Sequence, residues 1–272
     1  MKKSLTYVII SLIVFWFVNK TYGLMPALGL MLAAIAFLLW DRRASVLTQM
    51  AVQAYFVRGN VQQGEKLYKM AYKTGLMNAN CKISYSSFCL RENHFEKGRR
   101  LLNEVINSSF AGTADKINAK HNLAILTWKE GNLDEAIKIL EIVHKQMPAT
   151  NTYGTLGVLY IEKAKRDKTY ADVLDFMLEA YDYNDLDKTI ADNLGELYLV
   201  MGEYEKAKEV YTKLLKVEQI TPMPYYNYAL VLKNMGDTKG AKENFEKALS
   251  CRFTSVLTVT KEMVEEQLEN LN

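Results

Sequence analysis

Residues 191–214 decide the fold, and they read Ala-Asp-Asn-Leu-Gly-Glu-Leu-Tyr-Leu-Val-Met-Gly-Glu-Tyr-Glu-Lys-Ala-Lys-Glu-Val-Tyr-Thr-Lys-Leu. Their first half places Leu194, Gly195 and Tyr198 on one stripe of a helix. In their second half, Ala207, Tyr211 and Leu214 follow one another at spacings of four and three. These residues form the apolar stripe of a second helix. Small residues let two helix backbones approach closely where they cross. The stretch therefore predicts two antiparallel helices that cross at Gly195 and Ala207.

The same pattern recurs along the chain. The small residue that follows Ala207 in the same role is Ala241, 34 positions further on. Similar copies precede this stretch, so the sequence predicts six units, at 45–78, 79–112, 117–150, 151–187, 188–221 and 222–255. The fourth unit has four extra residues, about one helical turn, which we place between its two helices. An amphipathic helix is predicted to follow at about 256–271.

The aligned Leu194-Gly195, Tyr198, Ala207 and Tyr211 resemble the tetratricopeptide repeat (TPR), a 34-residue helix-turn-helix unit. The resemblance covers about four-fifths of the chain. It implies an all-α solenoid of about six repeats whose first helices line a concave face. The final helix would be a solubilising cap, with a polar outer face that carries Glu262, Glu265, Glu266 and Glu269.

Two uncharged runs, at residues 4–18 and 22–40, precede the repeats. The second run would form a helix about 28 Å long, enough to span a bilayer, and Gly23 and Pro26 are expected to break the helix between the runs. We therefore expect a transmembrane helical hairpin in a domain over residues 1–43, followed by the TPR superhelix over 44–272. A single span, with the other run buried or at the membrane interface, is the alternative.

Charge predicts the orientation of this hairpin. Lys2 and Lys3 lie at the start of the hairpin, and Arg42 and Arg43 lie at its end. The loop between the two runs holds only one basic residue, Lys20. By the positive-inside rule, the repeats then face the cytoplasm. Residues 41–150 carry net charge +6 and residues 151–272 carry −6, so the half beside the membrane suits anionic lipid. The excess of lysine over arginine, 26 to 8, is typical of an AT-rich bacterial genome, so we expect the membrane to be a bacterial cell membrane.

No catalytic or cofactor motif is found in the sequence. His94, His121 and His144 fall in three different predicted helices without metal-ligand spacing, and there is no phosphate-binding glycine loop or Cys-x-x-Cys pair. The acidic run 182–187 lacks the glycine and the final glutamate of a calcium loop, so it is read as a polar turn. The repeats also lack a basic-aromatic stripe for nucleic acid. We expect a protein that is not an enzyme and binds no metal, cofactor or nucleic acid.

The predicted site is the concave groove. Asparagines recur just before the Leu-Ala, Leu-Gly or Tyr-Ala pairs, where in resembling proteins they hydrogen-bond the backbone of a bound peptide. The candidate binding residues are Asn122, Asn193, Asn227, His121, Trp128 and Tyr226. The groove positions that are basic in repeats binding acidic carboxy-terminal tails are here Val46, Asn80, Asn118, Asn151, Thr189 and Met223. A groove for acidic tails is therefore not expected.

The predicted function is that of a membrane-anchored scaffold. It would bind a partner protein or peptide in the concave groove, while the hairpin, in contact with lipid, confines it to the membrane plane. The alternative is a structural subunit, packed permanently into a membrane complex through the hairpin or the tyrosine-rich convex face.

Overall fold

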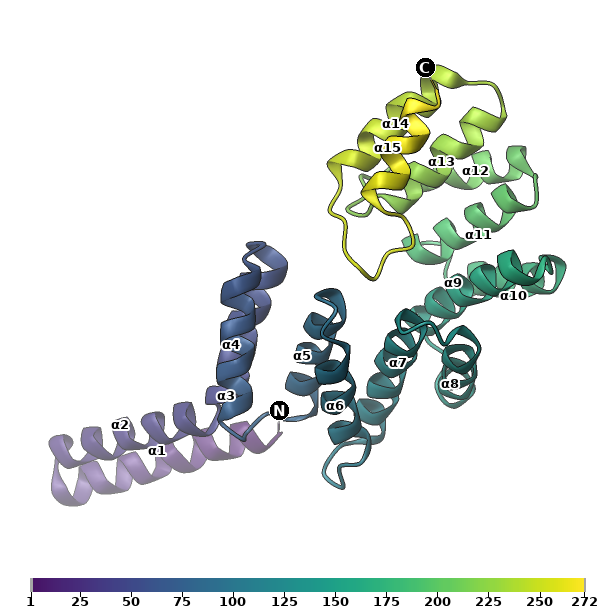
Figure 1. Cartoon of the computed structure of the whole chain (residues 1–272). Coiled ribbons are helices and arrows are strands. Elements are labelled where there is room, and N and C mark those ends of the chain that lie inside the picture. Colours follow the sequence, from purple (N-terminus) through teal and green to yellow (C-terminus); the bar gives the residue numbers. More distant parts are fainter. Residues whose placement is uncertain (1, 272) are drawn as a thin grey trace. The chain divides into compact units, whose positions relative to one another are not determined.

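The apolar stripes of the sequence form consecutive α-helices in the computed structural model, which describes residues 2–271 (Figure 1). No β-strand occurs among these residues. The chain divides into two compact units, Met1–Tyr85 and Ser86–Asn272, and the boundary lies inside a helix. The all-α repeat architecture predicted from the sequence is confirmed, whereas the predicted domain boundary at residues 43 and 44 stays a prediction.

The first unit begins with two long helices that pack against each other. Its elements are α1 (Lys2–Tyr22), α2 (Leu24–Asp41), α3 (Arg43–Val52), the π-turn η1 (Gln53–Val57), α4 (Val61–Lys73) and the start of α5 (Ala79–Arg91). Gly23, at φ 90°, separates α1 from α2 in a backbone conformation that suits glycine. The expectation that Pro26 also breaks the helix is wrong, because Pro26 lies in the first turn of α2, where a missing N–H costs no helical hydrogen bond.

Helices α1 and α2 expose many large apolar side chains, among them Trp16 at 61% and Phe37 at 68% of their full area. We call these two helices the α1–α2 hairpin. Within the described residues, no single helix is both long and apolar enough to cross a membrane. The segments Leu24–Leu38 and Arg43–Val57 meet that requirement only as a pair, bent by 58° at the break between them. The transmembrane role of the hairpin therefore stays a prediction.

The second unit is built from consecutive helix pairs. After the end of α5 it contains α6 (Phe95–Ile106), α7 (Thr113–Lys129), α8 (Leu133–Gln146), α9 (Thr150–Asp167), α10 (Ala171–Tyr183), α11 (Lys188–Val200), α12 (Tyr204–Leu214), α13 (Met223–Asn234), α14 (Thr238–Ser250) and α15 (Lys261–Glu269). The helices from α7 to α14 pack in consecutive odd–even pairs, and α11 also packs on both α9 and α13. The first helices thus form an inner layer and the second helices an outer one.

Turn chemistry sets the limits of these helices. Asp187 begins α11 by accepting hydrogen bonds from the backbone N–H groups of Thr189 and Ile190, both at 3.0 Å. Gly202 and Gly236, which follow α11 and α13, have φ of 79° and 84°. The acidic run before α11 is therefore a polar turn and helix cap, as predicted.

The predicted crossing of α11 and α12 is confirmed. A Cβ atom placed on Gly195 would lie 2.6 Å from the Cζ atom of the Tyr211 ring, so only glycine fits there. Ala207 and Tyr211 are fully buried, and the Tyr211 hydroxyl donates to the backbone carbonyl of Asp192 at 3.1 Å. The small residues read from the sequence are those that bring this helix pair together.

Two details of the repeat prediction are wrong. The extra residues of the fourth repeat extend α9 to Asp167, and only residues 168–170 separate α9 from α10. The last helix begins at Lys261 instead of residue 256, because residues 251–260 form an irregular segment between α14 and α15. Figure 1 shows this segment as the long loop that precedes α15.

Candidate functional site: an inner cavity between the first helices

The second unit encloses a cavity of about 500 Å³ along its inner helix layer, which we call the inner cavity. It is lined by Arg91, Ile125, Trp128, Thr155, Val158, Lys188, Thr189, Asp192, Gln219, Ile220, Thr221, Met223, Pro224, Val256, Leu257 and Thr258. The lining side chains come from the end of α5, the first helices α7, α9, α11 and α13, the loop between α12 and α13, and the segment before α15. A cavity of this size lies within the range of ligand sites in proteins.

Most of the wall of the inner cavity is apolar. Ile125 and Trp128 come from α7, Val158 from α9, and Met223 with Pro224 from the start of α13. Three first helices therefore contribute apolar side chains to a shared surface, while the role of this surface as a partner groove stays a prediction.

Two basic side chains reach the same cavity from helix ends. Arg91 is the last residue of α5 and Lys188 the first of α11. The Lys188 ammonium donates to the backbone carbonyl of Glu218 at 3.1 Å. Both side chains come from helix ends, which the repeat alignment does not consider, and the expectation that the groove does not bind acidic tails stays a prediction.

A buried carboxylate lies at the edge of the inner cavity. Asp192 accepts hydrogen bonds from the Tyr211 hydroxyl at 3.1 Å and from the Asn227 amide at 3.3 Å. Burial raises the pKa of Asp192 to about 7, and the nearby Glu196 carboxylate adds to the rise. The two hydrogen bonds and the Lys165 ammonium act in the opposite direction without cancelling it. Such perturbed groups beside a cavity are typical of functional sites, and also of structural networks.

The neighbouring charge network joins two repeats. Lys165 of α9 donates to Glu162 at 3.0 Å on its own helix and to Glu196 of α11 at 2.5 Å. Burial by itself would lower the pKa of Lys165, but the two carboxylates outweigh it and raise that pKa. Lys165 belongs to the extra turn of α9, so that turn supplies a cation beside the buried acids of α11.

The three predicted asparagines connect consecutive first helices. Asn122 donates to the Ser87 hydroxyl at 3.3 Å, and Asn193 donates to the Gly154 carbonyl at 2.7 Å. Asn227 donates to Asp192, as described above. Each bond reaches the preceding first helix, and the Asn193 side chain is completely buried. The recurrence of asparagine thus has a structural role that sequence reasoning missed, while its role in partner binding stays a prediction.

The other three candidates occupy different environments. His121 is buried, with Nε2 3.1 Å from the Thr155 hydroxyl, and burial lowers its pKa to about 4. Tyr226 is buried against the Phe245 ring, with centroids 5.7 Å apart. Of the six candidates, Trp128 alone lines the inner cavity, and the Lys129 ammonium lies 4.0 Å from its ring centroid. Asp192, Ile125 and Val158 are among the cavity residues that lie outside this set of six.

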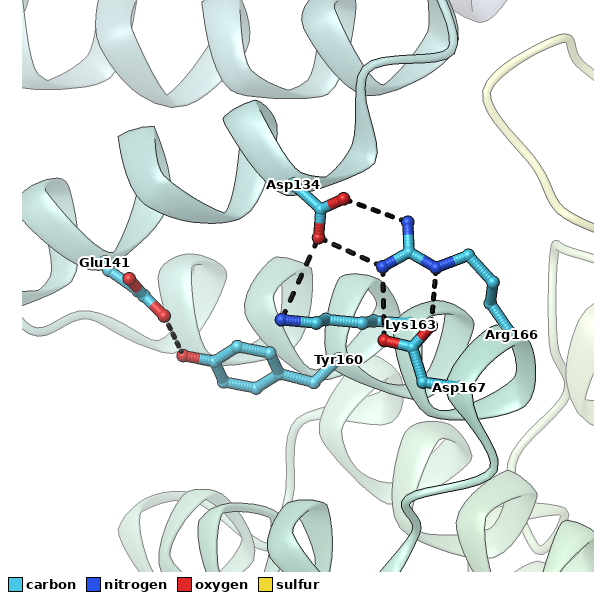
Figure 2. Close-up of polar contacts among 6 residues, drawn as sticks. All are labelled: Asp134, Glu141, Tyr160, Lys163, Arg166 and Asp167. Carbon is cyan, nitrogen blue, oxygen red and sulfur yellow. Dashed lines mark hydrogen bonds and ion pairs between the residues drawn. The ribbon is translucent and has the colours of Figure 1, made fainter.

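An exposed ion cluster holds α8 against α9 on the other side of the fourth repeat (Figure 2). The Arg166 guanidinium donates to both carboxylate oxygens of Asp134, at 3.0 and 3.1 Å, and also to Asp167 beside it. Lys163 lies 3.8 Å from Asp134. The Arg166 hydrogen bonds lower the pKa of both aspartates. The charges of these residues are paired with one another, so the cluster stabilises the contact between the third and fourth repeats.

A second contact joins the same pair of helices. The Tyr160 hydroxyl of α9 donates to Glu141 of α8 at 3.0 Å, and burial together with this carboxylate raises the Tyr160 pKa (Figure 2). No group of three or more His, Cys, Asp or Glu side chains within residues 2–271 is arranged to hold a metal ion.

Comparisons with known proteins agree with this geometry. Residues 190–220 and 224–252, which form α11–α12 and α13–α14, each match the family model for the tetratricopeptide repeat. A tetratricopeptide repeat protein from Parabacteroides merdae is similar in structure, with a TM-score of 0.65, 15% identity, and coverage of 98% of this chain and 99% of that one. The chain is a helical repeat protein of the TPR type.

Two further structures share this TPR-type fold. A thermophilic TPR protein of Thermus thermophilus has a TM-score of 0.58 at 15% identity, with 71% of this chain and 98% of that chain covered. PilF of Pseudomonas aeruginosa has a TM-score of 0.56 at 14% identity, with 85% of this chain and 99% of that chain covered. No curated protein matches the sequence. At these identities the likeness concerns the fold alone.

Proposed function

We propose that this TPR-type protein is a non-enzymatic scaffold that binds a segment of a partner protein in its inner cavity. The observation that carries the proposal is the shared wall to which four consecutive first helices contribute, with apolar side chains from α7, α9 and α13 and polar ones from α11. Trp128 offers a large aromatic surface at this wall, of the kind that dominates protein interfaces. Asn122, Asn193 and Asn227 support the wall from behind by fixing the spacing of the first helices.

We further propose that the α1–α2 hairpin attaches the scaffold to a bacterial cell membrane, with the repeats in the cytoplasm. Large exposed apolar surfaces are rare on soluble monomers and mark contacts with lipid or protein. Exposed Leu32 and Phe37 on α2 are part of such a surface. Confinement to a membrane would raise the effective concentration of the scaffold near partners in the same plane.

A structural subunit is the second candidate, and the same exposed hairpin favours it. Apolar side chains such as Trp16 and Phe17 could equally be covered by the helices of another protein. In that case the hairpin, and not the inner cavity, would hold the partner.

Partner capture separates the two candidates. The full-length chain is crosslinked in cells, its partners are identified by mass spectrometry, and binding is then measured for Val158→Asp and for Leu32→Asp with Phe37→Asp. A charge on Val158 in the cavity wall should weaken scaffold binding by about tenfold or more, since an unpaired buried charge is costly. The control is Leu186→Asp, at a turn position that is 87% exposed. Loss of binding in the hairpin variant alone would overturn the cavity proposal and support the subunit.

Membrane attachment has its own test. Alkaline carbonate should leave the wild-type chain and Leu186→Asp in the membrane pellet, because an inserted apolar hairpin is not released by breaking ionic contacts. The Leu32→Asp, Phe37→Asp variant should shift towards the supernatant. Wild-type protein found in the supernatant would contradict the anchor.

A further inference from the structure

The segment that joins α14 to α15 runs along the inner cavity. We call residues 252–260 the strap. Val256, Leu257 and Thr258 of the strap line the inner cavity opposite the first helices. Val259 is buried, and residues 253–258 are partly buried. A connection between a repeat and its capping helix needs only a few residues, so this longer route across the inner layer calls for a physical explanation.

The strap is tied to the first helices by polar contacts. The Ser255 hydroxyl lies 3.2 Å from the carbonyl of Leu90 and 2.7 Å from that of Arg91, at the end of α5. Carbonyls in the last turn of a helix lack partners within the helix, so a hydroxyl there is well placed to donate. The Lys129 ammonium at the end of α7 donates to the backbone carbonyl of Leu257 at 3.2 Å. Side-chain donors that hold a backbone carbonyl are also how a groove holds a peptide.

The chemistry of the strap matches the wall that it faces. Its central residues, 253–259, read Phe-Thr-Ser-Val-Leu-Thr-Val and contain no charge. The opposite wall is largely apolar, with Ile125, Trp128 and Val158 among its side chains. A charged segment would lose hydration against this wall without gaining a partner for each charge.

The strap does not fill the space that it crosses. A cavity of about 500 Å³ remains between it and the first helices. Side chains that border this space are packed on one side only, so fewer contacts hold them than in a filled core. A segment held by few hydrogen bonds over incomplete packing can be displaced at low cost.

We propose that the strap is the chain's own occupant of the inner cavity, and that the partner segment is a non-helical, uncharged peptide with aliphatic and hydroxyl side chains that displaces it. This inference rests on the proposed function, because it names the class of partner for the same cavity. Because the strap competes for the inner cavity, it lowers the affinity of the scaffold for the partner peptide. Only a peptide that makes better contacts than the strap displaces it.

A peptide of residues 253–260, which carries no charged side chain, with a fluorescent label is the probe. Its binding to the full-length chain is measured by anisotropy for wild type, for Ser255→Ala with Val256→Asp, and for Leu186→Asp. The two strap substitutions remove the hydroxyl contact and place a charge against the apolar wall, so the peptide should bind this variant about tenfold more tightly than wild type or Leu186→Asp. Adding Val158→Asp should abolish the gain. Equal affinity for all variants, or a gain that survives Val158→Asp, would overturn the proposal.

Hydrogen exchange gives a second measurement that does not depend on the affinity of the peptide. Backbone amides of 253–259 should exchange about tenfold faster in Val158→Asp and in the strap variant than in wild type, while Leu186→Asp should leave them unchanged. Circular dichroism melting of each variant shows whether the repeats remain folded. Unchanged exchange in a folded Val158→Asp protein would show that the strap is not held by the cavity.

The two proposals can fail separately. If the strap measurements fail while a captured partner still requires Val158, the strap inference is wrong and the scaffold proposal stands. If the strap responds as expected but the captured partner ignores Val158, the strap is an internal brace and the cavity is not the partner site.

Discussion

The fourth and fifth repeats use the same small residue for different purposes. In the fifth repeat, Gly195 of α11 faces the ring of Tyr211 on α12, so it brings together the two helices of one repeat. In the fourth, a Cβ atom on Gly157 would lie 2.6 Å from the Asn193 amide and 2.8 Å from the Met177 sulfur. Gly157 therefore accommodates the next repeat as well as its own partner helix. The same position of the repeat pattern therefore determines how the two helices of one repeat pack in α11. In α9 it also determines how one repeat stacks on the next.

The two repeats also place their charges differently. The fifth repeat buries Asp192 and nearly buries Glu196 on the inner side. The fourth carries an extra turn on α9, whose Arg166 forms an exposed cluster with Asp134 of the preceding repeat. Buried charge makes the fifth repeat sensitive to pH, whereas exposed charge makes the fourth sensitive to salt.

Changing the two glycines should show the largest difference between the repeats. Gly195→Leu should cost about 3 kcal/mol or more of unfolding free energy, because the added side chain meets a fully buried aromatic ring. In the matched pair, Gly195→Ala should cost more than Gly157→Ala, since the Met177 thioether can move aside. Urea unfolding of the full-length chain measures both. A larger cost for Gly157→Ala would reverse the assignment of the tighter crossing.

The buried acid of the fifth repeat should give the next largest effect. The folded pKa of Asp192 is raised from 3.8 to about 7, so the unfolded chain loses this proton first as pH rises. The contribution of Asp192 to stability therefore falls between about pH 4 and pH 7. Asp192→Asn does not titrate, so it avoids this loss. The difference in unfolding free energy between Asp192→Asn and wild type should therefore change in favour of the variant by roughly 2–3 kcal/mol from pH 5 to pH 8.

Asp134→Asn is the control for this pH dependence. The folded pKa of Asp134 is lowered, so its contribution to stability is present above the unfolded pKa and is lost only in acid. The difference between Asp134→Asn and wild type should therefore stay constant from pH 5 to pH 8. A constant difference for Asp192→Asn as well would show that the Asp192 carboxylate is solvated in the folded protein.

The stacking of the two repeats depends on Asn193, and this contact gives a smaller effect. Asn193→Ala should cost about 1–2 kcal/mol, because the bond to the Gly154 carbonyl is lost and a small cavity is left between the two buried helix faces. The groove interpretation of the sequence expected these asparagines to affect binding and not melting, so the structure changes that expectation. The control is Asn103→Ala, at an exposed position of α6. Equal melting of both variants would mean that water replaces the Asn193 amide without loss.

The sequence alone predicts what is periodic in this fold. A spacing of 34 residues locates Ala207 and Ala241, and the apolar stripes locate the helix pairs around them. The extra residues of the fourth repeat were misplaced because length alone does not say which element takes them up. Their composition gives a signal, since Lys163, Ala164 and Arg166 all favour helix.

The candidate site could be predicted only in part. The first helices do line a cavity, and Trp128 does face it. Asn193 lies between two first helices, and a single helical pattern cannot tell which neighbour a side chain contacts. The sequence predicts an amphipathic helix from about residue 256, which takes in the second half of the strap, although the β-branched Val and Thr residues there disfavour helix. Its contact with α5 lies about 165 residues away in sequence, beyond any local rule.

The exposed cluster of the fourth repeat should give the smallest effect. Arg166→Gln removes the guanidinium that forms two hydrogen bonds with the Asp134 carboxylate. Lys163 is then the remaining cation beside that carboxylate. Ion pairs at the surface contribute little, because water and salt screen them and the side chains lose freedom on pairing. We expect a small drop in melting temperature at low salt that disappears at about 1 M NaCl, where the Debye length is about 3 Å.

The control for this cluster is Lys213→Gln on α12, whose partner Glu209 lies 2.9 Å away within the same helix. Losing that pair removes no link between repeats, so its effect should be smaller than that of Arg166→Gln at low salt. Hydrogen exchange should also rise at α8 and α9 in Arg166→Gln, but remain unchanged there in Lys213→Gln. If both variants melt alike at low salt and α8 stays equally protected, Arg166 does not hold the repeats together, and the extra turn of α9 acts through the half-buried Lys165 alone.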